Sequence, residues 1–393
     1  MNPKRYCQIF LLLTGGLLLV VALVNFQVDP IGAYPGWHLQ AFAPQRDSMF
    51  SRMARGEQAR RGDCDMAIFG TSRPKAGMPS SHPAFATRRA RNFAVDAACM
   101  TEAAAMFDYC LAHNPIRRVV LCLDFALFRP MAFNQLGMEE TRFHPDLSLF
   151  DYHCKNILGA DPTSRSFRFV TDVLSHKSPP AAQRRGFYVH QLKPGSTHRL
   201  RFEKIIRSLA YGNATLQVAP EQMQALRHVL AKCRDRHVEL TLAINPVHAL
   251  DLELFQVGHS WERFEQWKRD LVKMVAEESP DDRVVVWDFT AYDGLPAEKI
   301  PPAGDSTRMK FYFESSHYTP VTGGLMLDRM FQNATNDFGR KISVANLEEH
   351  LKNTRAQREA FVARYPADVE WAHGVARKVL AGRRHDADPA EGE

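Results

Sequence analysis

Two short segments far apart in the chain carry the residue types of a serine nucleophile and its base. Ser72 follows an apolar run and a glycine, in the sequence Gly70-Thr71-Ser72-Arg73. His317 ends the sequence Glu314-Ser315-Ser316-His317. A serine hydroxyl is a weak nucleophile at neutral pH and needs an adjacent base, usually a histidine that a carboxylate orients. Glu314 lies three residues before His317, close enough to hold its Nδ1 and favour the tautomer that accepts a proton at Nε2. The pattern predicts that Ser72, His317 and Glu314 act together.

Each of these residues also has an ordinary structural interpretation. A serine after a strand can cap the following helix, and a histidine in a loop is commonly solvated. Asp288 and Asp305 are alternatives to Glu314 for the acid, and spacing alone favours Glu314. None of the seven cysteines forms a C-x-x-C pair, so a zinc ribbon or a thioredoxin motif is unsupported. We expect no metal site and no cofactor.

The elements that must position these residues alternate between short apolar runs and amphipathic stretches. Helical spacing recurs at about residues 100–112, 221–235 and 261–277. Strands that alternate with helices indicate a parallel sheet covered on both faces, and strands buried on both faces read as continuous apolar runs. The sequence therefore predicts an α/β/α sandwich with a five-stranded parallel sheet, formed by residues 66–69, 92–95, 119–123, 240–244 and 284–287.

A parallel sheet gathers functional groups where the carboxyl ends of its strands meet. Ser72 follows the first predicted strand, Asp124 the third and His248 the fourth, and His317 lies in the loop region after the fifth. We therefore expect these residues at one edge of the sheet. His248 is either a site residue at its strand end or a packed histidine.

The chain divides into four regions. Residues 1–30 are expected to form an N-terminal anchor, 31–62 a linker and lead-in segment, 63–340 the α/β domain, and 341–393 C-terminal helices with a flexible tail. Residues 126–218 have no clear periodicity, and a structureless loop of that length is improbable in a compact domain. We expect a largely helical insertion there, beside the site.

The N-terminal anchor has the features of a transmembrane helix. Lys4 and Arg5 precede an uncharged apolar run over residues 9–28, about the 20 residues that cross a bilayer. The run is longer than the core of a cleaved signal peptide, and no small-x-small cleavage site follows it. The next basic residue is Arg46, so the positive-inside rule places the N-terminus in the cytoplasm and the main domain outside. Cys7 would then lie at the inner membrane face and the other six cysteines in an oxidising space, where some could pair.

The charge of the chain does not indicate a nucleic-acid partner. The formal net charge is +6 over 393 residues. No block of Lys and Arg is interleaved with aromatic residues, as a nucleic-acid surface would require.

The two segments that contain Ser72 and His317 also fit a known family pattern. Over about residues 64–339 the chain resembles the SGNH (GDSL-like) hydrolase superfamily, whose fold is flavodoxin-like. It is most similar to the membrane-anchored bacterial branch that includes polysaccharide O-acetylation and D-alanylation proteins. Gly70-Thr71-Ser72 matches the first block of the family, with Ser72 in the place of the nucleophile. Glu314 and His317 match its last block, with glutamate in place of the usual aspartate.

The middle blocks of the family pattern differ in this chain. Family members tend to have Asn-x-x-x-x-Gly after the second strand, where this chain has Asn92 and, five residues later, Ala97. The N–H of Ala97 could still donate to an oxyanion, although a positive φ is unfavourable for alanine. The family has an asparagine where this chain has Asp124, and an ionised aspartate can only accept hydrogen bonds. Either Asp124 has another role, such as holding Arg73, or the oxyanion hole depends on the backbone N–H groups of Ser72 and Ala97. Arg73 could alternatively bind a carboxylate or phosphate of a substrate.

The resemblance implies a membrane-tethered, periplasmic serine esterase or O-acyltransferase in the bacterial inner membrane. Its substrates would be acyl esters, most simply acetyl esters, of cell-envelope polysaccharide, and its partner a multi-pass membrane O-acyltransferase. Ser72 would form the acyl-enzyme and His317 would act as the base. The alternative is a catalytically inactive scaffold or glycan-binding protein with the same fold, which the departures at Ala97 and Asp124 favour.

Overall fold

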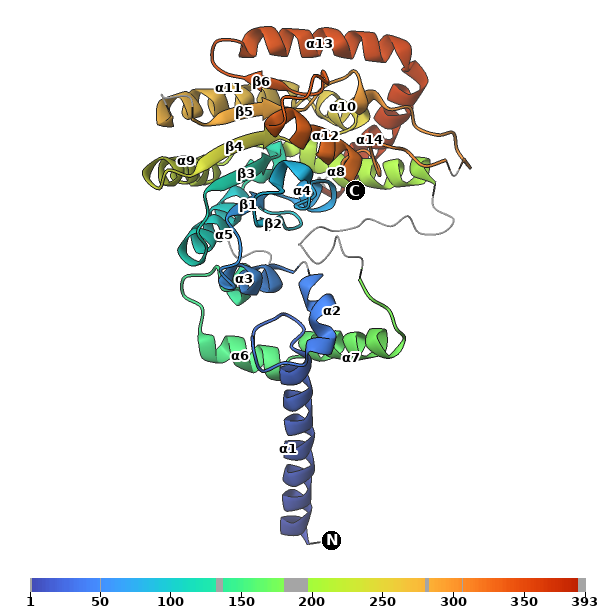
Figure 1. Cartoon of the computed structure of the whole chain (residues 1–393). Coiled ribbons are helices and arrows are strands. Elements are labelled where there is room, and N and C mark those ends of the chain that lie inside the picture. The colour runs from blue at the N-terminus through green and yellow to red at the C-terminus, as the bar shows by residue number, and fades with distance from the viewer. Residues whose placement is uncertain are drawn as a thin grey trace.

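A single sheet of six strands forms the centre of the protein in the computed structural model (Figure 1). The structure describes residues 2–49, 51–131, 137–179, 197–279, 283–305 and 307–387. The strand order is β2-β1-β3-β4-β5-β6, in which the first five strands are parallel and β6 runs antiparallel to β5. The strands are β1 Met66–Phe69, β2 Ala90–Asn92, β3 Arg118–Leu123, β4 Glu239–Ile244, β5 Val285–Asp288 and β6 Arg340–Ile342.

The prediction of a mixed α/β fold around a largely parallel sheet is confirmed, but the count of five strands is wrong. All five predicted strands are present, with β2 two residues earlier than expected. The sixth strand, β6, is only three residues long, and two of its residues, Arg340 and Lys341, are exposed. It pairs at the edge of the sheet, where Asp288 faces Arg340. Its sequence therefore has no apolar run that could have marked it as a strand.

The register of the parallel strands brings their carboxyl ends together. Phe69 at the end of β1 pairs with Leu121 of β3, and Ile244 at the end of β4 pairs with Leu123 of β3. Ile244 also pairs with Asp288, the last residue of β5. The segments that follow β1, β3, β4 and β5 therefore leave the sheet at the same edge.

The helices of the α/β domain surround the sheet, and their buried faces join its apolar residues in one large core. Helix α5 (Met100–His113) packs against α9 (Pro220–Asp235), and α9 packs against α11 (Trp261–Glu278). On another side, α10 contacts both α8 and α14 (Figure 1). These helices are α4 Ser72–Gly77, α5 Met100–His113, α8 His198–Thr215, α9 Pro220–Asp235, α10 Ala249–Val257, α11 Trp261–Glu278, α12 Pro320–Phe331, α13 Leu347–Arg364 and α14 Pro366–Ala387. Short 3-10 helices span Gln40–Phe42, Pro83–Phe85, Phe125–Phe128, Met138–Glu140 and Leu295–Ala297.

Helices α4 and α12 approach each other unusually closely. A Cβ added at Gly323 of α12 would lie 1.7 Å from the carbonyl oxygen of Gly77 in α4. A Cβ at Gly77 would in turn lie 2.1 Å from the ring of Tyr318. Glycine is therefore required at both positions. This contact holds the helix that begins at Ser72 against the segment that follows His317.

The N-terminal helix α1 (Pro3–Val28) extends away from the α/β domain (Figure 1). Its 26 residues are long and apolar enough to cross a membrane, with a mean hydropathy of 2.6 over its most apolar window. Only 6% of that window is buried against the rest of the protein. After α1, the short helices α2 (Ala43–Asp47) and α3 (Arg52–Arg60) lead into the α/β domain, where α3 packs against α5.

The predicted insertion at residues 126–218 is largely helical where the structure describes it, but most of it does not lie beside the site. It contains α6 (Leu149–Leu158), α7 (Ala160–Leu174) and α8. Helices α6 and α7 pack against α1, and α8 packs on α10 and α14. Residues 132–136 and 180–196 of the insertion lie outside the described residues.

The C-terminal helices α13 and α14 are present, and α14 packs against α8 and α10 of the α/β domain. Glu253 of α10 accepts hydrogen bonds from Arg358 of α13 at 2.7 and 3.0 Å and from His373 of α14 at 2.8 Å. The end of the predicted flexible tail, residues 388–393, lies outside the described residues. All seven cysteines are free in the structure, so none of the pairings expected for an oxidising space is present.

Candidate active site

Ser72, His317 and Glu314 form a continuous hydrogen-bonded relay. His317 Nε2 lies 2.8 Å from Ser72 Oγ, and His317 Nδ1 contacts Glu314 Oε1. The Glu314 carboxylate also accepts the backbone N–H of Ser316 at 2.8 Å and that of His317 at 2.9 Å. The structure thus brings together the three residues that the sequence pattern selected, within the reach that proton transfer requires.

The surroundings of Glu314 keep it ionised beside the imidazole. Its burial opposes ionisation, but the nearby His317 and the backbone N–H groups of Ser316 and His317 outweigh that effect and lower the pKa of Glu314. An ionised Glu314 accepts the proton on Nδ1 of His317, which leaves Nε2 free to accept the hydroxyl proton of Ser72. The carboxylate therefore fixes both the orientation and the tautomer of the imidazole.

Ser72 is presented by a tight turn at the end of β1. Gly70 has φ +146°, and a Cβ there would lie 2.7 Å from the side chain of Pro74 and 2.8 Å from the carbonyl oxygen of Cys122. Thr71 is the N-cap of α4, and its side chain accepts the N–H of Arg73 at 3.5 Å. Capping is thus the role of Thr71, so Ser72 is not needed for it and its hydroxyl is directed to His317.

The loop that carries His317 is held by backbone contacts on two sides. The Glu298 carboxylate accepts the N–H groups of three successive residues, Lys310, Phe311 and Tyr312, at 2.6, 2.9 and 3.2 Å. The N–H of Phe313 donates to the carbonyl oxygen of His317 at 2.9 Å, which closes the loop on itself. These contacts fix the backbone from which the imidazole reaches Ser72.

Arg73 and Asp124 form a buried ion pair next to the relay. The sequence left open whether Arg73 pairs with Asp124 or binds a substrate, and the structure has the pair. Arg73 Nη1 donates to Asp124 Oδ1 at 2.5 Å. Asp124 also accepts the hydroxyl of Thr71 and the amide N–H of Asn245, the latter at 3.0 Å. Arg73 Nη2 and Nε donate to Ser316 Oγ at 2.9 and 3.1 Å. The pair therefore ties the loops after β1, β3 and β4 to the loop that carries His317.

This arrangement determines which groups could stabilise an oxyanion. Asp124 is only 3% exposed, and its carboxylate is engaged with Thr71, Arg73 and Asn245, so it supplies no donor toward Ser72. Ala97 is exposed and has φ +52°, the left-handed conformation that glycine would adopt without strain. The backbone N–H groups of Ser72 and Ala97 donate to no residue that the structure describes. They are the candidate donors.

The sequence left open whether His248 is a site residue or a packed histidine. In the structure it is a packed histidine that supports the site. It is the N-cap of α10, where its Nδ1 accepts the N–H of Leu250 at 3.2 Å. Its Nε2 donates to the carbonyl oxygen of Glu298 at 2.7 Å. Burial lowers the pKa of His248 to about 4. Both nitrogens of the neutral ring are therefore engaged, one with the N-terminus of α10 and the other with Glu298, whose carboxylate holds the loop that carries His317.

The alternative acids are placed elsewhere. Asp288 is fully buried and pairs with Lys268 at 2.6 Å and with His350 at 2.9 Å. Asp305 accepts the N–H of Thr307 in an exposed turn. Neither contacts His317, so the geometry favours Glu314 as the group that orients the imidazole.

Sequence reasoning missed Asp251, a buried carboxyl on α10. Asp251 Oδ2 lies 3.5 Å from Arg73 Nη2, and its Oδ1 accepts the hydroxyl of Ser315 at 3.2 Å. Burial raises the pKa of Asp251 to about 7, with Glu314 adding to the effect and Arg73 opposing it. Nothing in the sequence marked Asp251, because it lies within a helix whose residues are nearly all buried. Ser316 did lie in a segment that the sequence singled out, but its contact with Arg73 was not foreseen.

The described residues contain no group of three or more His, Cys, Asp or Glu side chains arranged to hold a metal ion. No protein-family model matches the chain, and no curated protein matches its sequence significantly.

Proposed function

We propose that the chain is a membrane-tethered serine esterase or O-acyltransferase of the SGNH type that acts on acyl esters of envelope polysaccharide. The observation that carries the proposal is the relay in which His317 Nε2 lies 2.8 Å from Ser72 Oγ while Glu314 holds Nδ1. A hydrogen-bonded nucleophile, base and orienting acid form the arrangement by which serine hydrolases of unrelated folds activate their nucleophile.

The first half of the reaction forms an acyl-enzyme. His317 Nε2 takes the proton of the Ser72 hydroxyl as Oγ attacks the ester carbonyl carbon, and the carbonyl oxygen becomes an oxyanion. The tetrahedral intermediate collapses when the bond to the leaving alcohol breaks, and that oxygen takes the proton from His317. Glu314 stays ionised throughout and stabilises the imidazolium.

The second half transfers the acyl group. His317 removes a proton from water or from a sugar hydroxyl, whose oxygen attacks the carbonyl carbon of the acyl-enzyme. The bond to Ser72 Oγ then breaks, and His317 returns its proton to that oxygen. Hydrolysis and transfer differ only in the acceptor, so the same residues serve both.

The oxyanion would be stabilised by the backbone N–H groups of Ser72 and Ala97. With Asp124 held by Arg73 and Asn245, the site has one donor fewer than the family pattern implies. Losing one such donor typically costs about 10²–10³ in rate. We therefore expect slow turnover of simple esters.

Further features support a tethered enzyme of this family. The parallel strands follow the order 2-1-3-4-5, which is the flavodoxin-like order of doubly wound sheets. Helix α1 is long and apolar enough to cross a membrane. Lys4 and Arg5 at its start favour a cytoplasmic N-terminus, an inner-membrane location and a periplasmic domain. A domain held beside the membrane could take acyl groups from a multi-pass membrane O-acyltransferase.

Hydrolysis of p-nitrophenyl acetate by the purified full-length protein in detergent tests the proposal. We expect Ser72→Ala to abolish turnover and also covalent labelling by a fluorophosphonate. Ser343→Ala is a matched control, because Ser343 lies in the exposed turn between β6 and α13, and it should leave both signals unchanged. Equal rates for the Ser72→Ala and unsubstituted proteins would remove Ser72 as the nucleophile.

A second candidate function is a scaffold that binds glycan or a membrane partner without turnover. The observation that favours it is the carboxylate of Asp124 at the position where the family has an amide donor. This function predicts no fluorophosphonate label at Ser72 and retained binding of envelope polysaccharide by the Ser72→Ala protein.

A further inference from the structure

Helices α6 and α7 lie crosswise to α1 at its C-terminal end, on the side of the molecule opposite to α13 (Figure 1). Asn25 of α1 is fully buried, and its Nδ2 donates to the carbonyl oxygen of Ile157 and to Thr163 Oγ1, both at 2.8 Å. These two acceptors flank Gly159, where α6 ends and α7 begins. The junction of the two helices is therefore fixed at the height of Asn25.

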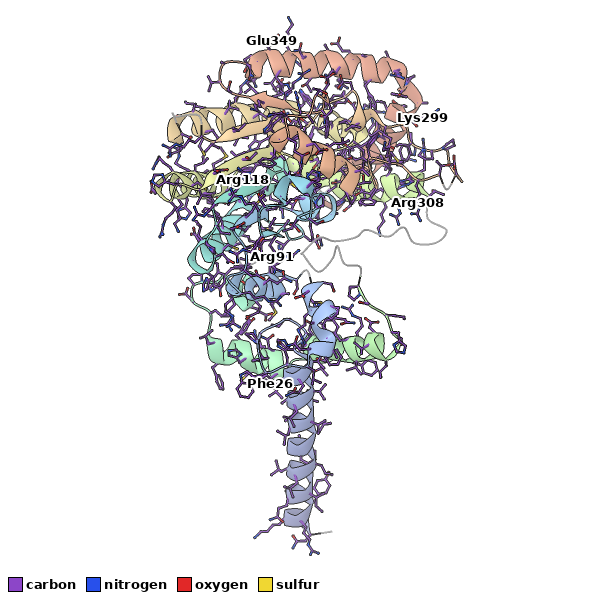
Figure 2. All side chains as sticks on the ribbon, viewed as in Figure 1. Phe26, Arg91, Arg118, Lys299, Arg308 and Glu349 are labelled. Carbon is purple, nitrogen blue, oxygen red and sulfur yellow. The ribbon has the colours of Figure 1, made fainter. Side chains whose placement is uncertain are left out.

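The height of Asn25 corresponds to one boundary of a membrane that α1 would span. The exposed apolar side chains of α1 run from Tyr6 to Val24 and stop just before Asn25. At about 1.5 Å of rise per residue this stretch is roughly 27 Å long, close to the ~30 Å thickness of the hydrocarbon core. Phe26, labelled in Figure 2, lies where α1 reaches the level of α6 and α7.

Both crosswise helices expose large apolar side chains. Phe150 of α6 is 78% exposed, and Phe167 and Leu174 of α7 are 72% and 74% exposed. Spacings of three and four residues place Phe167, Val170 and Leu174 on one face of α7. The same spacings place its charged residues on another face, formed by Asp161, Arg165, Arg168 and Asp172. Such helices are typical of the membrane interface, where the apolar side lies among the acyl chains and the charged side remains in water.

A tryptophan lies at the same level. Trp37 is 75% exposed, in the loop after α1. This loop returns to the end of α1, because the N–H of Leu39 donates to the carbonyl oxygen of Gln27 at 2.9 Å. Tryptophan is enriched where membrane and water meet.

We propose that α6, α7 and Trp37 form a platform that rests on the lipid surface from which α1 emerges. Phe150, Phe167, Leu174 and Trp37 enter the boundary between headgroups and acyl chains. Individual exposed apolar residues are normal on soluble proteins, but here they gather at the height where the apolar part of α1 ends. The inference rests on α1 crossing a membrane and not on the chemistry proposed for Ser72.

The platform is joined to the α/β domain by buried polar contacts. Glu57 of α3 is 1% exposed, and its Oε1 accepts the hydroxyl of Tyr152 in α6 at 2.5 Å. The same oxygen accepts Arg142 Nε at 2.8 Å. Because α3 packs against α5, the platform fixes the height and direction of the catalytic edge over the lipid surface. A single flexible tether would leave both undefined.

Depth-dependent quenching of tryptophan fluorescence tests the platform in the full-length protein reconstituted in phosphatidylcholine–phosphatidylglycerol vesicles. Each variant adds one tryptophan, by Phe150→Trp or Phe167→Trp, to a Trp37→Phe parent. The parent keeps four other tryptophans, at positions 261, 267, 287 and 371, and its signal is subtracted. The matched control is Arg168→Trp, one residue from Phe167 but on the charged face. Leu17→Trp reports separately whether α1 lies in the bilayer.

We expect lipids carrying a doxyl group near the headgroup to quench the tryptophans at positions 150 and 167. Because these tryptophans would lie in apolar surroundings, their emission should be shifted to the blue of that of the tryptophan at position 168. The tryptophan at position 168 should instead be quenched by aqueous iodide. Doxyl lipids could quench Leu17→Trp while aqueous iodide quenches Phe167→Trp as it does Arg168→Trp. This result would show that α1 lies in the bilayer but that α7 does not rest on it, and it would overturn the proposed platform. A Phe167→Trp signal shielded from both quenchers would mean that a second copy of the chain covers this face, which also overturns the proposal.

Discussion

Arg73 and Ser316 are 243 residues apart in the chain, yet Arg73 Nη2 donates to Ser316 Oγ at 2.9 Å and Nε donates to the Ser316 carbonyl oxygen at 3.1 Å. Ser316 is the neighbour of the proposed base, and Arg73 is the neighbour of the proposed nucleophile. The guanidinium therefore sets the distance between the loop of Ser72 and the loop of His317. Its remaining nitrogen is held by Asp124.

We expect Arg73→Lys to lower kcat by about 10–100-fold with little change in KM, because a single ammonium nitrogen lacks the planar fork whose separate nitrogens span Asp124 and Ser316, so the reacting groups drift apart. Steady-state hydrolysis of p-nitrophenyl acetate measures the effect. Arg227→Lys is the matched control, since Arg227 also bridges two carboxylates, Glu277 and Glu278, but on the surface. An unchanged kcat in Arg73→Lys would show that Ser72 and His317 align without this bridge.

Glu314→Gln should reduce the esterase rate by about 10²–10⁴-fold, because a neutral amide neither fixes the tautomer of His317 nor stabilises the imidazolium. Glu314→Asp keeps the charge but withdraws it from His317, so its rate should lie between those of Glu314→Gln and the unsubstituted protein. Single-turnover acylation monitored by p-nitrophenol release measures both. Glu348→Gln alters a solvent-exposed carboxylate paired with Arg269 and should have no effect. A Glu314→Gln protein with full activity would assign the orienting role to another group.

Ala97→Gly should stabilise the protein by about 0.5–1 kcal/mol, because φ +52° strains alanine but not glycine. The backbone N–H stays in place, so esterase activity should be retained. Chemical unfolding of the detergent-solubilised chain measures the free energy of unfolding. Ala97→Val should lower the free energy of unfolding, since a β-branched residue tolerates a positive φ least. A loss of stability in Ala97→Gly would contradict the strain at this position.

The buried His248 should make stability depend on pH. Burial lowers its pKa in the folded protein to about 4, whereas in the unfolded chain the pKa is about 6.5. The contribution of His248 to the free energy of unfolding is complete above pH 6.5. It is lost as pH falls toward 4, because the unfolded chain then binds a proton that the folded chain does not. The loss amounts to roughly 3 kcal/mol over this window.

His248→Asn isolates this effect, since asparagine can still cap α10 but does not titrate. The stability advantage of the unsubstituted protein over the variant should shrink as pH falls from 7 to 4. Asp251 has a raised pKa of about 7 and so contributes the opposite slope, with stability lost as pH rises. Its contribution is common to both proteins and cancels in the difference. If the difference in unfolding free energy between the unsubstituted protein and His248→Asn did not change with pH, His248 would have the same pKa in the folded and unfolded chains.

The sequence predicted most of the elements that position the site. The apolar run at 66–69 and the Gly70-Thr71-Ser72 turn after it located β1 and Ser72, because a fully buried parallel strand has a continuous apolar sequence. The spacing of Glu314 and His317 located the other half of the relay, since both lie in one short loop whose geometry depends on local contacts.

Other features depend on contacts that no local pattern encodes. The role of Asp124 is set by Thr71 and Arg73, which follow β1, and by Asn245, which follows β4. Asp251 enters the network only because α10 folds against Arg73. The edge strand β6 is too short and too charged to have a strand signal. The sequence of residues 126–218 has no clear periodicity, so neither the bounds of α6 and α7 nor their packing on α1 around Asn25 could be predicted from it.

The 245 residues between Ser72 and His317 have a consequence for the biogenesis of the protein. Ser72 follows the first strand made, β1, while its proposed base follows the last parallel strand, β5. A nascent chain that ends before residue 314 contains the Ser72 hydroxyl but neither Glu314 nor the imidazole of His317. The proposed relay therefore cannot form until the chain has been made as far as His317, long after Ser72 and its strand.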